Sequence, residues 1–236
     1  MHPVDLVLVA LFAIIWPLYG ATLGRKYLQA AVAAGTPGAR RAAYIDTIFF
    51  QWMFAALAAA AALEHGLSAE ALRLLPPVGA GLAVSVGAIV LGIALIVLNG
   101  RSATSPAGIA ALRKAVQPLA WFLPHDRADR ALFRPMSLTA GVVEEWLFRG
   151  WLLAVLTPLA GVAGAIAISC ALFGLAHAYQ GPGGIVKTGI VGLLFSGLAW
   201  ATGSLWAPIV LHAAVDWMQG DLIVKALEED RLPVAA

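Results

Sequence analysis

The sequence has few of the residues that a soluble or secreted domain normally carries. Only 12% of its 236 residues are charged, the net charge is +2, and the single cysteine, Cys170, excludes an intrachain disulfide. No cluster of basic residues indicates a nucleic-acid partner. The chain is instead 61% hydrophobic, with a mean hydropathy of +0.86, whereas a soluble domain is roughly 45–50% apolar. This composition indicates a multi-pass membrane protein.

Long apolar stretches predict an all-α bundle of seven transmembrane helices. The expected spans are residues 4–24, 45–63, 78–98, 137–156, 161–178, 185–202 and 205–224. The region 99–136 contains four prolines and reads as too broken for one spanning helix. Within it, the apolar spacing of residues 109–121 predicts an interfacial helix. An eighth span is expected only if this region enters the bilayer.

Basic residues are concentrated in two of the loops. Segments 25–41 and 99–136 carry ten of the fifteen lysines and arginines, whereas the loop between the second and third spans carries only Arg73. The positive-inside rule then predicts an N-terminus outside and a C-terminus in the cytoplasm. The alanine-rich, proline-marked composition fits a bacterial cytoplasmic (inner) membrane. Basic residues follow the first apolar stretch, so we expect a permanent helix and no cleaved signal peptide.

We expect one integrated membrane domain in three sequence regions. Residues 1–136 would supply N-terminal helices and the interfacial segment, residues 137–224 the functional core, and residues 225–236 a cytoplasmic tail. The strongly polar side chains within the spans all follow residue 140, and charges at membrane depth are costly and usually functional. They are Glu144, Glu145, Arg149, His177, Lys187, His212 and Asp216.

Glu144 and Glu145 are adjacent, so they face different neighbours on their helix. Glu145 and Arg149 are four residues apart, a spacing that predicts an ion pair on one helix face. The fourth span enters the membrane from the cytoplasm with Glu144 near its start, and the fifth span ends at the cytoplasm with His177 in its last turn. Glu144 and His177 are therefore expected at the same depth in the membrane. Both glutamates would lie in the first two turns of their span.

Two more pairs have the same spacing of four residues. Phe173 lies one turn before His177, and His212 one turn before Asp216. A buried glutamate can act as a general base, and a neighbouring histidine can orient the same water. A second histidine with a carboxyl neighbour can stabilise the oxyanion formed when water attacks an amide. The set therefore favours hydrolysis.

The order Glu-Glu-x-x-x-Arg, Phe-x-x-x-His and His-x-x-x-Asp resembles the three motifs of the CAAX protease and bacteriocin-processing (ABI) family. This family includes the type II CAAX prenyl endopeptidases. The resemblance covers roughly residues 137–220 and implies an all-helical intramembrane endopeptidase, usually described with eight membrane helices. It implies that Glu144 activates water with help from His177, that His212 and Asp216 stabilise the oxyanion, and that Glu145 and Arg149 support the site.

Asp216 departs from the family pattern, which often has asparagine there. An ionised carboxylate cannot donate to an oxyanion, so Asp216 is expected either to be protonated or to orient His212. We expect no cofactor and no metal, because the sequence contains no His-Glu-x-x-His. The alternative is a zinc ion held by His177, His212 and Glu144.

The sequence also allows functions other than proteolysis by an activated water. Cys170 and Ser196 are conceivable nucleophiles, but each reads more simply as a packing residue. A non-proteolytic immunity or scaffold protein with this fold is the main alternative, and a transporter would show inverted repeats that the halves lack. The expected partners are membrane lipid and a peptide or membrane-protein substrate of unspecified sequence, and the oligomeric state is left open.

Overall fold

The computed structural model describes residues 2–102 and 105–228, and these residues form helices and connecting turns without a strand. The helices are α1 (Pro3–Val9), α2 (Trp16–Tyr19), α3 (Arg25–Ala33), α4 (Ala39–Glu64), α5 (Gly79–Ser102), α6 (Pro106–Val116), α7 (Arg127–Glu145), α8 (Leu153–Ala176), α9 (Pro182–Thr202) and α10 (Trp206–Glu228). Short π-helical segments are η1 (Ala10–Ile15), η2 (Gly20–Gly24) and η4 (Trp146–Leu152), and 3-10 turns are η3 (Gln117–Leu119) and η5 (Ala178–Gln180).

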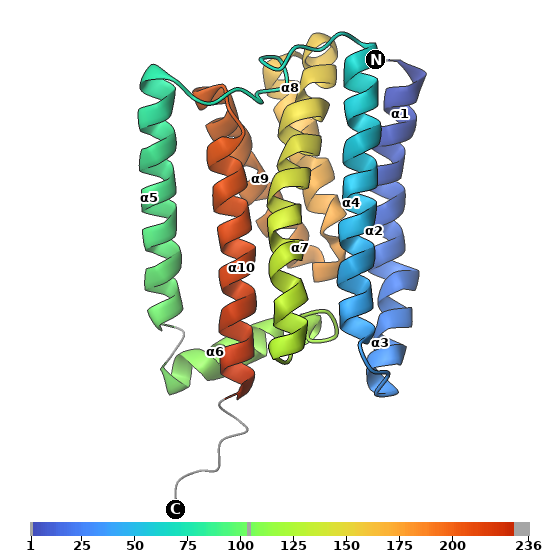
Figure 1. The fold of residues 1–236 in the computed structure, drawn as a ribbon, viewed down its shortest axis with the longest axis vertical. Helices are drawn as coiled ribbons and strands as arrows, with labels where there is room; N and C mark the ends of the chain where they lie inside the picture. The colour runs from blue at the N-terminus through green and yellow to red at the C-terminus, as the bar shows by residue number, and fades with distance from the viewer. Residues whose placement is uncertain (1, 103–104, 229–236) are drawn as a thin grey trace, which may run out of the picture.

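The long helices stand nearly parallel and α6 lies across one end of them. Figure 1 shows α5, α10, α7, α4 and the continuous α1–α3 rod in a row, with α8 and α9 behind. The helix α7 packs against both α4 and α10, which places it in the middle of the bundle. The crosswise orientation of α6 agrees with the predicted interfacial helix, although α6 begins at Pro106 and ends at Val116.

Seven helical passes are present among the described residues, the number predicted from hydropathy. By length and composition, five helices could cross a membrane. The longest of these, Arg127–Ala176, reverses at Gly161, whose φ of 66° only glycine adopts easily, so it makes two passes. The helix α10 supplies the seventh pass and continues to Glu228, beyond the predicted end of the last span. Residues 229–236 of the predicted tail lie outside the described residues.

The predicted start of the fourth span at residue 137 is wrong. The helix α7 begins ten residues earlier in sequence, at Arg127, where the carboxylate of Asp126 accepts a hydrogen bond of 2.7 Å from the amide of Asp129 as an N-cap. Pro135 lies inside α7. Glu144 consequently lies midway between Arg127 and Gly161, and not in the first turns of its helix.

The outer surface of the bundle is apolar, as a lipid-facing surface must be. Large apolar side chains are exposed on every pass; examples are Leu18, Phe49, Leu91, Leu138, Ile168, Leu194 and Val210. In water such a surface would be a large contiguous hydrophobic patch. The protein is therefore a membrane-embedded, multi-pass helical protein.

A close helix contact brings two motif-bearing helices together. A Cβ atom built on Gly141 of α7 would lie 2.7 Å from the Cβ of Ala213 and 2.8 Å from its amide nitrogen on α10. Only a glycine allows this approach, a common device in membrane bundles. Gly141 lies one turn before Glu145, and Ala213 directly follows His212. The contact therefore sets the distance between the first and third motifs.

The α8–α9 hairpin is shorter than the helices in front of it. Its turn contains η5 and Gly181, and in Figure 1 this turn stops well before the level of α6. The descending leg of α8 after Gly161 comprises only residues 162–176. His177 is at the end of this short leg, and it therefore lies within the depth of the bundle.

Candidate active site

The first motif lies where α7 changes into the π-helical segment η4. Glu145 is the last residue of α7, and Arg149 is in η4. A π-helical turn frees backbone carbonyls from their usual partners. Here the oxygen of Phe148 accepts a hydrogen bond of 3.0 Å from Ser169 Oγ, and the oxygen of Arg149 is 3.4 Å from Arg73 Nη1. Two other segments thus stabilise the turn.

Glu145 and Arg149 form the predicted ion pair. Arg149 Nη1 lies 3.0 Å from Glu145 Oε1, and both side chains are fully buried. The Arg149 guanidinium also lies 4.0 Å from the centroid of the Phe173 ring, a cation–π contact. The pair is therefore an internal structural element of the bundle that joins α7 to the second motif.

Glu145 also contacts the third motif. His212 Nδ1 donates a hydrogen bond of 2.8 Å to Glu145 Oε1. This bond fixes the orientation of the imidazole and directs Nε2 away from Glu145. Asp216 Oδ2 lies 3.7 Å from that Nε2, beyond hydrogen-bonding distance, and its side chain is 38% exposed. Glu145, and not Asp216, therefore orients His212.

Glu144 faces both histidines. Its Oε2 atom lies 3.8 Å from His177 Nε2 and 3.8 Å from His212 Nε2. Its Oε1 atom accepts a hydrogen bond of 2.8 Å from Gln51 Nε2 of α4. Oε2 is buried, and none of the described residues forms a hydrogen bond with it. The carboxylate is thus held at one oxygen and free at the other.

His177 is held by its own helix. Its Nδ1 atom donates a hydrogen bond of 2.8 Å to the backbone oxygen of Phe173, because a carbonyl can only accept. In the neutral imidazole, Nε2 is then a lone-pair acceptor directed at Glu144. The Phe173 ring lies 4.8 Å from the His177 ring, centroid to centroid, and closes one side of the site as predicted.

The two other conceivable nucleophiles lie behind Arg149. Ser196 Oγ is fully buried and 3.4 Å from Arg149 Nε, and Cys170 Sγ is 3.7 Å from the same hydroxyl. Both side chains occupy the interior between α8 and α9, where they contact the structural arginine. Neither is paired with a histidine, as a serine or cysteine nucleophile would be.

All six predicted site residues are brought together, and two unpredicted residues join them. Gln51 lies 93 residues before Glu144 on α4, yet their side chains are in direct contact. The only signal in the sequence was an amide side chain within an apolar span. Tyr179 is a second unpredicted neighbour, with its ring centroid 5.8 Å from that of His177.

The residues named for a possible zinc ion converge on one point but do not form a recognised site. His177 Nε2 and His212 Nε2 both face Glu144 Oε2. Across residues 2–102 and 105–228, no group of three or more His, Cys, Asp and Glu side chains is arranged to hold a metal ion. Each of the two distances to Glu144 Oε2 is 3.8 Å, which is longer than a direct hydrogen bond.

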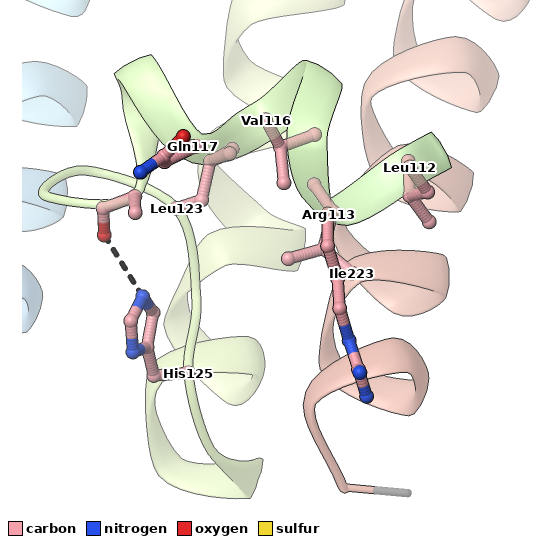
Figure 2. Close-up of a pocket in the computed structure, with 8 residues that line it drawn as sticks. Leu112, Arg113, Val116, Gln117, Leu123, His125 and Ile223 are labelled. Atoms are coloured by element: carbon pink, nitrogen blue, oxygen red, sulfur yellow. Dashed lines mark hydrogen bonds between the residues drawn. The ribbon is translucent and has the colours of Figure 1, made fainter. Parts of the chain in front are cut away.

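A separate apolar pocket lies under α6. Its volume is about 190 Å³, and His125 at its edge forms a hydrogen bond of 2.9 Å with the backbone oxygen of Ala120 (Figure 2). The lining residues are Leu112, Arg113, Val116, Gln117, Ala120, Leu123, His125 and Ile223. None of the site residues lines it, so the pocket is distinct from the site.

One of three comparisons with known proteins found a match. Residues 128–218 match the family model described as type II CAAX prenyl endopeptidase Rce1-like. No curated protein matches the chain. No solved structure matches it either. The matched segment includes α7, η4, α8, α9 and most of α10, and hence all three motifs.

Proposed function

We propose that this protein, whose residues 128–218 match the type II CAAX prenyl endopeptidase Rce1-like family model, hydrolyses a peptide bond with a water molecule activated by Glu144. The observation that supports this role of Glu144 is that two hydrogen-bond acceptors, its own Oε2 atom and His177 Nε2, face each other. Glu144 Oε2 and the His177 Nε2 lone pair are 3.8 Å apart without a direct bond. A water that donates one proton to each of them keeps an oxygen lone pair free for attack.

The reaction proceeds by proton transfers at named atoms. The water oxygen attacks the peptide carbonyl carbon as its proton passes to Glu144 Oε2, and the carbonyl oxygen becomes an oxyanion. Glu144 then returns this proton to the leaving amine when the C–N bond breaks. Gly141 supports this geometry because its close contact with α10 holds the third motif beside the first.

His212 and Asp216 are proposed to stabilise the oxyanion by donating hydrogen bonds to it. With Nδ1 bonded to Glu145, a doubly protonated His212 presents Nε2–H toward the space shared with Glu144. A protonated Asp216 carboxyl would supply a second donor from the next helical turn. Glu145 and Arg149 act as support, because both are fully buried and do not reach the open side of the site.

The site is proposed to act on the cytoplasmic side of an inner membrane. Ten of the fifteen basic residues lie in segments 25–41 and 99–136. These segments are at the end of the bundle that carries α6 and the α3–α4 connection (Figure 1). The positive-inside rule assigns that end to the cytoplasm. The turn of the α8–α9 hairpin, which bears His177, points in the same direction.

Two probes test hydrolysis by free water. The purified protein in lipid vesicles is incubated with a mixture of internally quenched peptides, and separately with a farnesylated peptide ending in a CAAX sequence. In water labelled with heavy oxygen, we expect one label in each new carboxyl terminus, detected by mass spectrometry. Added hydroxylamine should capture no acyl group.

Two outcomes would contradict this proposal. Formation of a hydroxamate would reveal an acyl-enzyme on a nucleophile such as Ser196 or Cys170. Absence of cleavage of both probes by a folded protein would favour the non-proteolytic immunity or scaffold role. The difference between the two probes also shows whether a prenyl group is needed for recognition.

Metal independence is a second part of the proposal. Peptide cleavage is expected to continue unchanged after dialysis against EDTA, and elemental analysis of the active protein is expected to find less than one zinc per chain. The physical reason is that Glu144 and His177 already supply two proton acceptors for one water. Stoichiometric zinc that is lost together with activity, and restored with it, would assign His177, His212 and Glu144 to the metal instead.

A further inference from the structure

Gln51 contacts the catalytic glutamate from outside the family segment. It lies near the middle of α4, far from residues 128–218 in sequence, and its Nε2 atom is 2.8 Å from Glu144 Oε1. A second contact joins the same two parts of the chain one turn later, where Trp146 Nε1 donates to the backbone oxygen of Ala55 at 3.3 Å. The helix α4 is thus fastened to the first motif at two levels.

The direction of the Gln51 hydrogen bond follows from the chemistry of its partner. An ionised carboxylate oxygen can only accept, so the amide must present its N–H group to Glu144. A hydrogen bond to an ionised group stabilises the charged form over the neutral one. It also restricts rotation of the carboxylate, which a general base within a lipid bundle needs in order to keep one oxygen on its water.

The two oxygens of Glu144 therefore have different tasks. Oε1 is occupied by Gln51, whereas Oε2 is 3.8 Å from both His177 and His212. If the carboxylate turned, Oε1 and Oε2 would exchange places or both would leave the histidines. The contact from α4 prevents this turn, because α4 itself is fixed by the Trp146–Ala55 bond.

We propose that Gln51 is a positioning residue, which holds Glu144 Oε1 through its amide N–H so that Oε2 is directed to the water between His177 and His212. This inference rests on the proposed role of Glu144 as the base. It assigns a function to α4, which lies outside the matched segment. The N-terminal half of the chain then completes the active site and does not merely surround it.

The test compares Gln51→Met, which keeps the length of the side chain without its amide, with wild type. Turnover of the quenched peptides is expected to fall about 10- to 100-fold with KM nearly unchanged. The infrared band of the protonated Glu144 carboxyl, identified by its loss in Glu144→Gln, should report a higher titration midpoint than in wild type, because the hydrogen bond that stabilises the ionised form is lost. Gln51→Glu should also lose turnover, because its carboxylate repels Glu144.

Thr47→Val is the matched control. Thr47 lies one turn before Gln51 on α4, and its hydroxyl donates a hydrogen bond of 2.8 Å to the backbone oxygen of Ala43 on the same helix. The Thr47→Val substitution removes a polar group from the same helix without changing a contact of Glu144, so turnover and the infrared titration midpoint should match wild type. The other titratable or charged groups that face Glu144 are unchanged in every variant: His177, His212, Asp216, Glu145, Arg149 and Tyr179.

The outcomes separate this inference from the proposed function. If Gln51→Met lowers the thermal midpoint but leaves turnover and the infrared titration unchanged, Gln51 only packs and the inference is wrong. If Glu144→Gln retains peptide cleavage, the proposed function itself fails. The infrared measurement needs no substrate, so it decides on the contact between Gln51 and Glu144 even when neither peptide probe is cleaved.

Discussion

Replacement of Glu144 by glutamine is expected to abolish peptide cleavage while the protein stays folded. Glutamine keeps the shape of the side chain but cannot take a proton from water, and a positioned general base contributes about 10²- to 10⁴-fold to a rate. Gln51 can turn its amide and still bond to the new side chain, so the thermal unfolding midpoint should be nearly unchanged. Cleavage of the quenched peptides measures the loss.

Glu144→Asp is the informative companion variant. It retains a base but withdraws the carboxylate by one methylene from both Gln51 and the histidines, so partial activity is expected. A Glu144→Gln protein that cleaves at the wild-type rate would show that another group activates the water. Of the described residues in the site, Asp216 would then be the first to test, because its side chain is the most exposed of the carboxylates.

Replacement of Arg149 by methionine is expected to be the most destabilising single change in the bundle. It leaves the Glu145 carboxylate fully buried without its cation, and breaking such a pair costs about 3–5 kcal/mol. The orientation of His212 should also suffer, because Glu145 holds its Nδ1 atom. Denaturant unfolding in mild detergent measures the free energy of unfolding, and peptide cleavage measures the consequence for the site.

Arg134→Met provides the matched control for Arg149→Met. Arg134 of α7 pairs with Asp221 of α10 at 2.7 Å, but this pair is partly exposed. Water can solvate the orphaned aspartate, so the loss of stability should be much smaller than at Arg149. Equal losses in the two variants would contradict the structural role of the buried pair. A Glu145→Gln/Arg149→Met double variant should recover part of the stability.

Spacing along single helices predicted the contacts that depend on one helix only. The pairing of Glu145 with Arg149 and the position of Phe173 beside His177 follow from residues four apart, and both are present. The shared depth of Glu144 and His177 was inferred from alternating spans, and their side chains do face each other. The resemblance carried by the three motifs agrees with the match of residues 128–218 to the Rce1-like family model.

Residue spacing along one helix cannot predict contacts between helices that are far apart in sequence. Gln51 reaches Glu144 across 93 residues, and a lone amide in an apolar span has no spacing partner that would reveal it. The bond between His212 and Glu145 was missed for the same reason, and Asp216 was considered in its place because it is four residues away. Register between helices depends on side-chain packing, such as the Gly141–Ala213 contact, which no local pattern encodes.

The prolines led to a wrong prediction of where α7 begins. The four prolines of region 99–136 were interpreted as breaks, but Pro135 lies inside α7. A proline removes one backbone donor, and the packing of neighbouring helices offsets this loss within a membrane bundle. The π-helical turn at Trp146–Leu152 was also not foreseen, because its carbonyl partners, Ser169 and Arg73, come from other segments.

The short α8–α9 hairpin has a consequence for the surrounding lipid. The leg after Gly161 comprises residues 162–176, and at 1.5 Å per residue it rises only about 22 Å. The hydrocarbon core of a bilayer is about 30 Å thick. This leg is therefore mismatched to the bilayer, whereas α9 with its 21 residues is long enough to cross it. Beside the short leg the bilayer must thin, or headgroups and solvent must reach the turn at its end. The proposed hydrolysis beside His177 would then draw its water from a local deformation of the membrane that the protein itself imposes.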